Sequence, residues 1–218
     1  MCIRDRVENP RLVVIWAGYP FAKDYKAPRG HGYSLEDVRG TGRLSDKTPG
    51  TCYSCKSPDV PRLMSEMGPA KFYAAKFSSY KDQIGNTIGC RDCHNPNTLN
   101  LEINRPAIVE AYQRQGKDIN KSSQNDMRSL VCAQCHSEYY FKGKVENYLT
   151  FPWDDGFDVE DFEKYYDKNG HVDFTHAVSG AKMIKMQQML FPQTVSYTHL
   201  VAPLLCARAA ARASSAAT

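Results

Sequence analysis

The sequence has no long hydrophobic run and no strong excess of charge of either sign. Its longest apolar stretch, residues 12–17, is far shorter than the ~20 residues that a membrane-spanning helix requires. The formal net charge of +4 gives no reason to expect nucleic acid as a partner. A hydrophobic content of 42% and a mean hydropathy of -0.54 are typical of an ordinary soluble protein that buries a core.

Strand signals are also scarce, whereas apolar residues recur at helical spacing in several segments. Ser123 and Asp126 have the form of a capping box, which opens a helix that runs into Cys132. The predicted helices cover residues 34–39, 61–80 with a break at Gly68-Pro69, 105–115, 123–132, 159–166 and 177–190. We therefore expect a mostly α-helical protein with long loops and few or no strands.

No disulfide framework is expected, because six of the eight cysteines form three C-x-x-C groups. These groups lie in three pentapeptides, which we call the first, second and third pentads: Cys52-Tyr53-Ser54-Cys55-Lys56, Cys90-Arg91-Asp92-Cys93-His94 and Cys132-Ala133-Gln134-Cys135-His136. In a C-x-x-C-H pentad both thiolates attach covalently to a c-type haem, and the histidine ligates the iron. The sequence therefore predicts three haem c groups and a core filled by haem as much as by side chains.

The first pentad differs from the other two because Lys56 stands where the pattern has histidine. A haem with histidine on both faces can only pass electrons, whereas one with a single strong donor leaves the other face free for substrate. The lysine must be neutral to ligate iron, although its ordinary pKa is about 10.4. The substitution thus predicts a substrate haem served by two electron-transfer haems.

A zinc ribbon is the alternative for the first two cysteine pairs, since C-x-x-C pairs also bind zinc. The spacing between these pairs is longer than in most zinc ribbons. Histidine directly after the second and third pairs is a feature that zinc ribbons do not require, and it favours haem.

Beyond the pentads, the sequence resembles the ammonia-forming cytochrome c nitrite reductases, which are multihaem enzymes of the bacterial periplasm. The resemblance covers roughly residues 7–187 and is carried by Trp-Ala-Gly-Tyr at 16–19, Arg-Gly-His at 29–31, Cys-Tyr-Ser-Cys-Lys-Ser-Pro-Asp-Val at 52–60, residues 132–140 and Phe-Pro-Trp-Asp-Asp-Gly at 151–156. It implies that Lys56 is the proximal ligand of a haem that reduces nitrite to ammonium with six electrons. It also implies that His94 and His136 ligate two relay haems.

The resemblance extends to residues around these haems. Arg43 matches the arginine that holds nitrite, with Arg39 as the second candidate because the loop before Cys52 is shorter than the family pattern. Either arginine can instead pair with a haem propionate. Tyr139 matches a tyrosine whose hydroxyl points into the nitrite pocket. His31 matches the distal ligand of the haem attached at the third pentad, with a surface histidine as the alternative.

A calcium site is also implied by the resemblance. Its protein ligands would be the Glu138 carboxylate, the backbone carbonyls of Tyr139 and Lys185, and the Gln187 side chain, a set of hard oxygens that suits Ca²⁺. A solvated carboxylate is the alternative for Glu138. The sequence departs from the family at Gln188, where the family has a catalytic histidine. Glutamine cannot deliver protons near neutral pH as imidazole does.

The two ends of the chain depart from the family as well. We expect the multihaem catalytic region to span residues 7–190, truncated before two further haem sites, and residues 1–6 and 191–218 to be non-native, adapter-derived sequence. The haem at His94 then lacks an identifiable second ligand in this chain. His171 and His176 are candidates, although exposed histidines of this kind are more often solvated.

These observations favour a periplasmic oxidoreductase with nitrite as substrate, a membrane-linked or soluble electron donor, and a homodimeric full-length form. The alternatives are a non-catalytic trihaem electron-transfer cytochrome and a related multihaem reductase of hydroxylamine or sulfite. A saturated lysine-ligated haem would be low-spin and indifferent to nitrite, whereas an open site would be high-spin.

Overall fold

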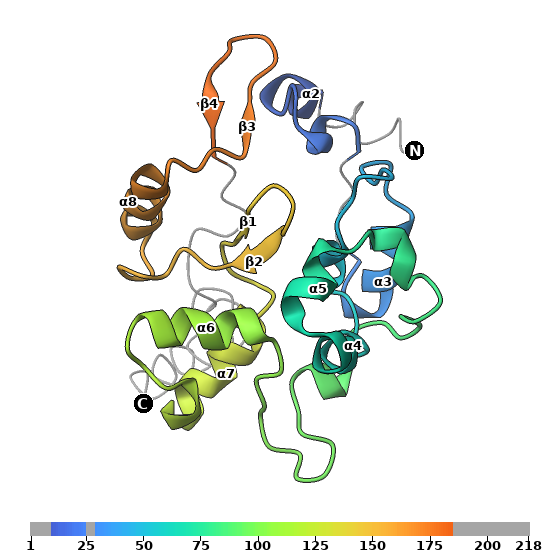
Figure 1. The fold of residues 1–218 in the computed structure, drawn as a ribbon, viewed down its shortest axis with the longest axis vertical. Coiled ribbons are helices and arrows are strands. Elements are labelled where there is room, and N and C mark those ends of the chain that lie inside the picture. The colour runs from blue at the N-terminus through green and yellow to red at the C-terminus, as the bar shows by residue number, and fades with distance from the viewer. Residues whose placement is uncertain (1–9, 25–28, 185–218) are drawn as a thin grey trace, which may run out of the picture.

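Helices dominate the part of the chain that the computed structural model describes, which is residues 10–24 and 29–184 (Figure 1). The α-helices are α2 (Arg11–Ile15), α3 (Ser34–Arg39), α4 (Val60–Met67), α5 (Pro69–Ala74), α6 (Pro106–Arg114), α7 (Gln124–Ala133) and α8 (Val159–Asn169). Short 3-10 helices are η1 (Pro20–Ala22), η2 (His31–Tyr33), η3 (Gly50–Tyr53), η4 (Phe77–Tyr80), η5 (Cys90–Asp92) and η6 (Ile119–Lys121). The prediction of a mostly α-helical protein is confirmed.

Helix boundaries follow local sequence signals. The Ser123 side chain accepts a hydrogen bond from the Asp126 backbone N–H, so the predicted cap opens α7. Gly68, with φ of 85°, ends α4, and the proline at the start of α5 begins the next helix, which explains the predicted break. Gly170, in the left-handed conformation, ends α8. None of the helices in the described residues is long and apolar enough to cross a membrane.

Two short antiparallel hairpins complete the fold. Strand β1 (Tyr140–Lys142) pairs with β2 (Tyr148–Thr150), with Phe141 opposite Leu149. Strand β3 (Phe174–Thr175) pairs with β4 (Lys182–Met183). Figure 1 shows α3, α4 and α5 on one side of the first hairpin and α6 and α7 on the other, and β2 packs against both α5 and α6.

The helix predicted over residues 177–190 is wrong for the part that the structure describes. Residues 176–181 form the turn of the second hairpin, in which the His176 N–H bonds the Ala181 carbonyl and the Gly180 N–H bonds the His176 carbonyl. Gly180 has φ of 71°, a conformation that interrupts a helix and suits a turn. The rest of the predicted range, residues 185–190, lies outside the described residues.

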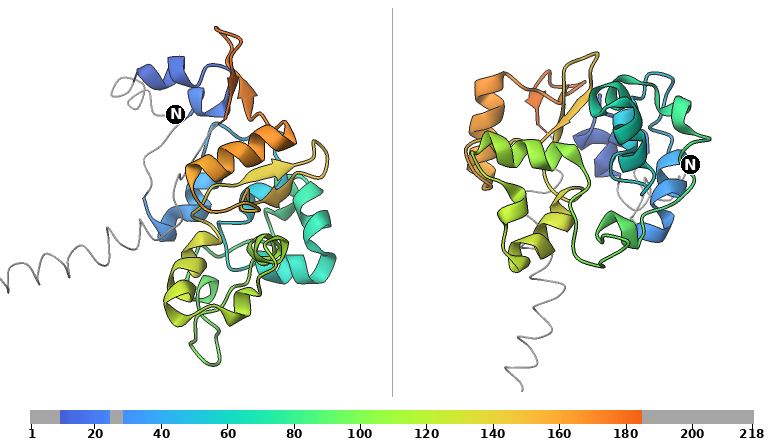
Figure 2. Two further views of the ribbon diagram at one scale, coloured as in Figure 1. Left: turned by 90° about the vertical axis from the view of Figure 1, so that its left-hand side faces the viewer. Right: turned by 60° about the horizontal axis from the view of Figure 1, so that its bottom comes forward.

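Residues 10–24, which include α2 and η1, lie beside this second hairpin, as Figure 1 and both views in Figure 2 show. The Ala177 N–H donates to the Ala17 carbonyl at 2.8 Å, and Tyr19 packs on Phe174 with ring centroids 4.7 Å apart. Segments about 160 residues apart in the chain therefore meet through a backbone bond and an aromatic contact.

The main hydrophobic core joins the first pentad to the helices around it. Tyr53, inside the first pentad, is fully buried and stacks on Phe77 with ring centroids 3.8 Å apart. Leu63 of α4, Ile108 of α6 and Trp153 belong to the same cluster. The first pentad is thus anchored from within by an aromatic side chain.

Gly50 marks the tightest backbone approach near this loop. An added Cβ would lie 2.5 Å from the Phe72 carbonyl oxygen and 2.6 Å from the Tyr80 ring. We predict that Gly50→Ala lowers the free energy of unfolding by about 1–3 kcal/mol, because a rigid backbone and a buried ring must move. The measurement is urea unfolding followed by circular dichroism.

Gly85→Ala is the matched control, since nothing lies within 4 Å of its added Cβ. It should stay within about 1 kcal/mol of the parent protein. Equal stability of the two variants would contradict the close approach at Gly50.

Candidate functional site

Each pentad adopts a single helical turn that presents its two cysteines together. The His94 N–H bonds the Cys90 carbonyl at 2.8 Å, and the His136 N–H bonds the Cys132 carbonyl at 2.7 Å. In the first pentad the Lys56 N–H instead bonds the Tyr53 carbonyl at 2.9 Å. This hydrogen bond spans three residues, as in a 3-10 helix, whereas those of the other two pentads span four. All six pentad cysteines are free thiols. The turn therefore suits covalent attachment of both thiols of a pentad to one group.

The first and third pentads lie against each other. The Cys55 and Cys135 thiols share a hydrogen bond, which lowers the pKa of Cys55 and raises that of Cys135. Burial raises the pKa of the Cys52 thiol to about 11, and the charges of Lys56 and Arg43 oppose that shift. Two attachment loops that are 80 residues apart in sequence thus share one interior.

A zinc ribbon is not supported by this arrangement. Within residues 10–24 and 29–184, no group of three or more His, Cys, Asp or Glu side chains is placed to hold a metal ion. The first two cysteine pairs therefore do not converge into the four-ligand site that structural zinc requires.

His31 and His136 face each other across a gap. Their ring centroids are 5.9 Å apart, and their planes are inclined by 40°. Desolvation lowers the pKa of His136, and the nearby positive charges of His31 and Lys56 lower it further. The separation matches two metal–nitrogen bonds of about 2 Å each plus the two ring radii. Two residues that sequence reasoning paired are therefore brought together by the fold.

His94 of the second pentad has one ring nitrogen engaged. Its Nδ1 lies 2.7 Å from the Leu99 carbonyl oxygen, in a loop where Leu99 has φ of 60°. Metal-ligating histidines typically donate one ring N–H to such a carbonyl, which leaves the other nitrogen for the metal. The ring of His94 is thus oriented as an axial ligand would be.

The other two candidate histidines have different surroundings. Both ring nitrogens of His176 are engaged, Nε2 with the Val14 carbonyl at 2.8 Å and Nδ1 with Ser179. His171 lies 3.3 Å from the Asp173 carboxylate and packs against Tyr140. Their contacts give neither histidine the orientation of a second ligand for the haem at His94.

Arg43 and Tyr139 both lie near the first pentad. The Arg43 guanidinium sits over the Phe21 ring, 4.6 Å from its centroid, and its charge acts on the pKa of Cys52. Burial raises the pKa of Tyr139 well above its ordinary value, and nearby Cys55 and Cys52 raise it further. Tyr139 therefore stays protonated and able to donate a hydrogen bond across the neutral range.

Tyr19 is a site residue that sequence reasoning did not assign. Burial raises its pKa well above the ordinary range, Asp173 adds to the shift, and the Arg43 charge opposes it. It packs on Phe21, the ring beneath Arg43, with centroids 5.3 Å apart. The signal in the sequence was the Trp-Ala-Gly-Tyr segment, which indicated the family but not a position beside Arg43.

Arg39, the second candidate for the nitrite-binding arginine, is bound elsewhere. It donates hydrogen bonds to the Tyr53 hydroxyl at 3.1 Å and to the backbone carbonyls of Lys81 and Ile84 at 2.8 and 2.6 Å. These contacts hold its guanidinium on the protein backbone. The structure therefore favours Arg43 over Arg39.

Glu138 is buried beside the candidate site, with 1% of its surface exposed. The Tyr166 hydroxyl donates to its Oε1 at 2.8 Å. Burial of a carboxylate is costly unless donors or a cation compensate its charge, and carboxylate oxygens are ligands that suit Ca²⁺. Lys185, Gln187 and Gln188 lie outside the described residues.

Comparisons with known proteins agree with this geometry. A family model for cytochrome c552 matches residues 3–202. The chain belongs to the cytochrome c552 family. The sequence resemblance to the cytochrome c nitrite reductases is thereby confirmed, and membership implies haem of the c type.

Individual relatives of the cytochrome c552 family show how much is shared. Cytochrome c-552 of Parabacteroides distasonis is 55% identical over 186 residues, which are 82% of this chain and 37% of the relative. Cytochrome c-552 of Porphyromonas gingivalis is 48% identical over 208 residues, 92% of this chain and 42% of the relative. The chain thus spans about two fifths of the length of these relatives.

A solved structure shares the fold of this family member. The catalytic subunit of cytochrome c nitrite reductase from Desulfovibrio desulfuricans, described as having two calcium sites, matches with a TM-score of 0.74 and 36% identity. The match covers 81% of this chain and 42% of that subunit. The fold of a multihaem cytochrome with few strands, as predicted from sequence, is confirmed.

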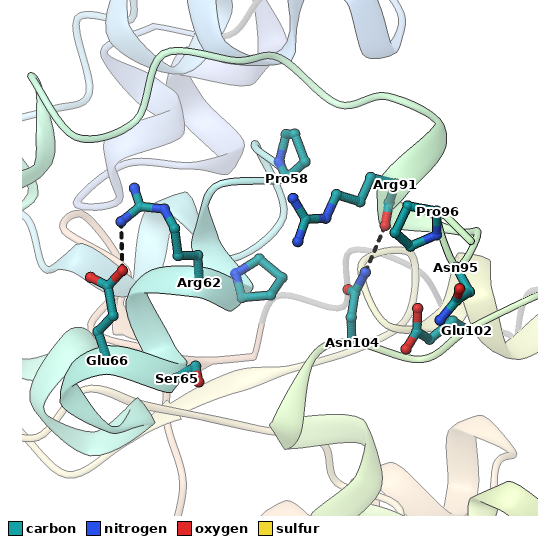
Figure 3. A pocket seen from close by; sticks show the side chains of 10 residues that line it. Pro58, Arg62, Ser65, Glu66, Arg91, Asn95, Pro96, Glu102 and Asn104 are labelled. Carbon is teal, nitrogen blue, oxygen red and sulfur yellow. Dashed lines mark hydrogen bonds and ion pairs between the residues drawn. The ribbon is translucent and has the colours of Figure 1, made fainter. Parts of the chain in front are cut away.

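A cavity of about 590 Å³ lies beside the second pentad and is lined by Arg91 of that pentad and by Pro58 of the segment after Lys56 (Figure 3). Its lining includes Arg62, which is paired with Glu66 at 2.9 Å, and Asn104, whose side chain donates to the Arg91 carbonyl. This cavity therefore borders both the second pentad and the segment that follows the first pentad.

The segment after Lys56 is tied to the loop that precedes the second pentad. The Asp59 carboxylate accepts hydrogen bonds from the backbone N–H groups of Gly85 and Asn86 at 2.9 and 3.0 Å and from the Asn86 side chain. Partial burial alone would raise the pKa of Asp59, but these bonds, with one from Ser57, outweigh it and hold the pKa below its ordinary range.

This lowered pKa predicts an acid-sensitive link. Because the folded pKa is below the unfolded value of about 3.9, the stabilisation is fully present above that value and is lost as pH falls through the folded pKa. We predict that Asp59→Asn flattens the dependence of the unfolding free energy between pH ~6 and pH ~3. Denaturant unfolding at both pH values measures it.

Asp82→Asn, a change at an exposed aspartate in the same region, is the control. Asp82→Asn should lose as much unfolding free energy between pH ~6 and pH ~3 as the parent protein does. If Asp59→Asn loses as much stability on acidification as Asp82→Asn does, the hydrogen bonds at Asp59 carry no pH dependence.

Proposed function

We propose that this chain forms the substrate-reducing region of a periplasmic cytochrome c that reduces nitrite to ammonium with six electrons at a Lys56-ligated haem. The observation that carries the proposal is the grouping of Arg43 and Tyr139 around the one pentad that has lysine in place of histidine. Membership of the cytochrome c552 family and likeness to a nitrite reductase catalytic subunit support it.

The first pentad is suited to hold the substrate haem. Cys52 and Cys55 would form its covalent links, and the Lys56 amine, once deprotonated, would ligate the iron. A haem bound there would supply an iron with one coordination position open to nitrite. The Ser34 hydroxyl donates to the Lys56 carbonyl at 2.9 Å, which fixes the lysine backbone.

Arg43 and Tyr139 would serve the substrate. Nitrite is an anion, and the Arg43 guanidinium, resting on the Phe21 ring, offers a fixed positive charge that attracts it and stabilises negative charge on the departing oxygens. The Tyr139 hydroxyl, kept protonated by burial, would donate a hydrogen bond to a nitrite oxygen. Reduction of nitrite to ammonium consumes protons, so groups that bring them to this pocket are required.

The second and third pentads would hold the relay haems. His136 and His31 would ligate one iron from opposite faces, which the 5.9 Å separation of their rings supports. His94 would ligate the other, with its ring oriented by the Leu99 carbonyl. An electron donor, membrane-linked or soluble, would feed these haems, and the full-length protein would form a homodimer.

Calcium would order the substrate side. The buried Glu138 carboxylate is adjacent in sequence to Tyr139, so an ion held by Glu138, the Tyr139 and Lys185 carbonyls and Gln187 would fix the tyrosine. Gln188 follows these ligands directly and supplies no titrating proton donor of its own.

Lys56→His tests the substrate haem. It should restore a C-x-x-C-H pentad and retain covalent haem, yet lower nitrite turnover by roughly 10- to 100-fold, a range seen even for supporting groups at metal sites. Haem content and nitrite-dependent ammonium formation are measured together, with the ferric spin state of the first haem by electron paramagnetic resonance (EPR).

Lys71→His, at an exposed position of α5, is the matched control and should leave turnover unchanged. Nitrite turnover in Lys56→His equal to that of the parent protein would contradict the proposal. A parent protein that is fully low-spin and whose spectrum nitrite does not change would instead favour the electron-transfer cytochrome.

Removal of calcium is a separate test of the substrate side. Glu138→Ala, or treatment with a calcium chelator, should lower nitrite turnover roughly 10-fold while haem content stays constant, because the ion acts through Tyr139. Bound calcium is measured by elemental analysis.

Glu163→Ala, at an exposed position on α8, is the control for the loss of one carboxylate. Equal losses of turnover and haem content in Glu138→Ala would mean that Glu138 has only a structural role.

A further inference from the structure

Arg105 occupies the centre of the region where the three pentads meet. Its side chain is 1% exposed, the lowest exposure of a charged group in an ion pair of the described residues. Burial of a guanidinium is costly unless every donor finds an acceptor, so its contacts are informative. Those contacts reach all three attachment loops, directly or through one further residue.

The contacts to the first pentad bracket Lys56. Arg105 Nε donates to the Ser54 carbonyl at 2.8 Å, and Nη2 donates to the Ser57 carbonyl at 2.9 Å. One planar guanidinium thereby holds the backbone immediately before Cys55 and immediately after Lys56. Lysine cannot reproduce this, because its amine is a single point charge without a rigid fork.

The contact to the second pentad is a buried ion pair. Arg105 Nη2 lies 2.5 Å from Asp92 Oδ1, and the other Asp92 oxygen accepts from the Gly89 N–H at 2.9 Å. Asp92 occupies the position before the second cysteine, as Ser54 does in the first pentad. The two pentads are therefore joined at equivalent positions.

The third pentad joins through Gln134, which again precedes the second cysteine. Its Nε2 donates to the Asp92 carbonyl at 2.7 Å, and its Oε1 accepts from the Asn104 N–H at 3.3 Å. Asn104 Oδ1 in turn accepts from Arg105 Nη1. Gln134 is 1% exposed, so the network is buried at the third pentad, whereas Asn104 is half-buried and lines the cavity beside the second pentad.

We propose that Arg105 is a positioning residue that fixes the relative placement of the three haem-attachment loops. The inference rests on the proposed function, because it requires haem at each pentad. A buried ion pair is often no more stabilising than an apolar pair of the same volume, so its role is better sought in geometry than in stability. Fixed loops would set the distances and orientations between the haems, and hence electron delivery to the Lys56 haem.

The test compares two double variants of the haem-loaded chain. Arg105→Met with Asp92→Leu removes both charges together and leaves neither buried alone. Arg62→Met with Glu66→Leu makes the same exchange at an exposed ion pair of α4, in which the two side chains are 47% and 54% exposed. Arg105→Lys is the second probe, because it keeps the charge but lacks the fork.

Three readouts are taken: haem content, reduction potentials by spectroscopic titration, and the EPR signals of magnetically coupled haems. We expect the Arg105/Asp92 variant to retain three haems per chain while its coupled signals change, its potentials shift and nitrite turnover falls at least ~10-fold, as small misplacements can cause. Arg105→Lys should change in the same direction. The Arg62/Glu66 variant should match the parent in every readout.

The outcomes separate the inference from the proposed function. Full haem content with parent-like potentials and EPR signals in the Arg105 variants would overturn the inference and leave the proposed function intact. Failure of both Arg105 variants to accumulate, with normal yield of the Arg62/Glu66 variant, would overturn it in favour of a stability role. A parent chain without three covalent haems would overturn both.

Discussion

The burial of one guanidinium among backbone carbonyls is the interaction on which the arrangement of this protein depends. The three pentads are turns from separate parts of the chain, so contacts between them must set their relative positions. Arg105 meets this need because its donors are directional and its plane is rigid. In each pentad the residue before the second cysteine, which is Ser54, Asp92 or Gln134, takes part in this network. A charge that would be costly in an apolar core therefore becomes the common reference point for the three pentads.

A second set of polar contacts also holds the backbone of the first pentad. The Ser34 hydroxyl binds the Lys56 carbonyl and lies 2.7 Å from the Thr87 hydroxyl, which is also 2.7 Å from the His31 carbonyl oxygen. The lysine backbone is thereby linked to the backbone of the histidine that faces His136. The aromatic stack of Tyr53 on Phe77 adds an apolar anchor within the same turn. The first pentad is thus held by the contacts of Arg105, by those of Ser34 and by the stack of Tyr53 on Phe77. Such support suits a pentad that ends in lysine where the pattern has histidine.

Local sequence signals predicted what is encoded locally. The pentads, the cap at Ser123 and the break at Gly68 each depend on a few adjacent residues, and the structure has the predicted turns and helix boundaries there. Arg105 was visible only as the residue before a helix-opening proline, because its acceptors on Ser54 and Ser57 lie 51 and 48 residues away. Tyr19 was missed for the same reason. The helix expected over residues 177–190 is wrong as far as residue 184, because Gly180, whose positive φ makes a turn, interrupts it.

The two networks also show how a site can be rigid while its reactive side chains stay free. Arg105 and Ser34 bind only main-chain carbonyls of the first pentad segment, those of Ser54, Lys56 and Ser57. No donor in these networks uses the Cys52 thiol or the Lys56 amine. Backbone contacts of this kind hold the turn whatever the side chain at its end, so the exchange of histidine for lysine leaves the support unchanged. The last residue of the pentad can therefore differ, lysine in the first and histidine in the other two, while the three turns share a single scaffold.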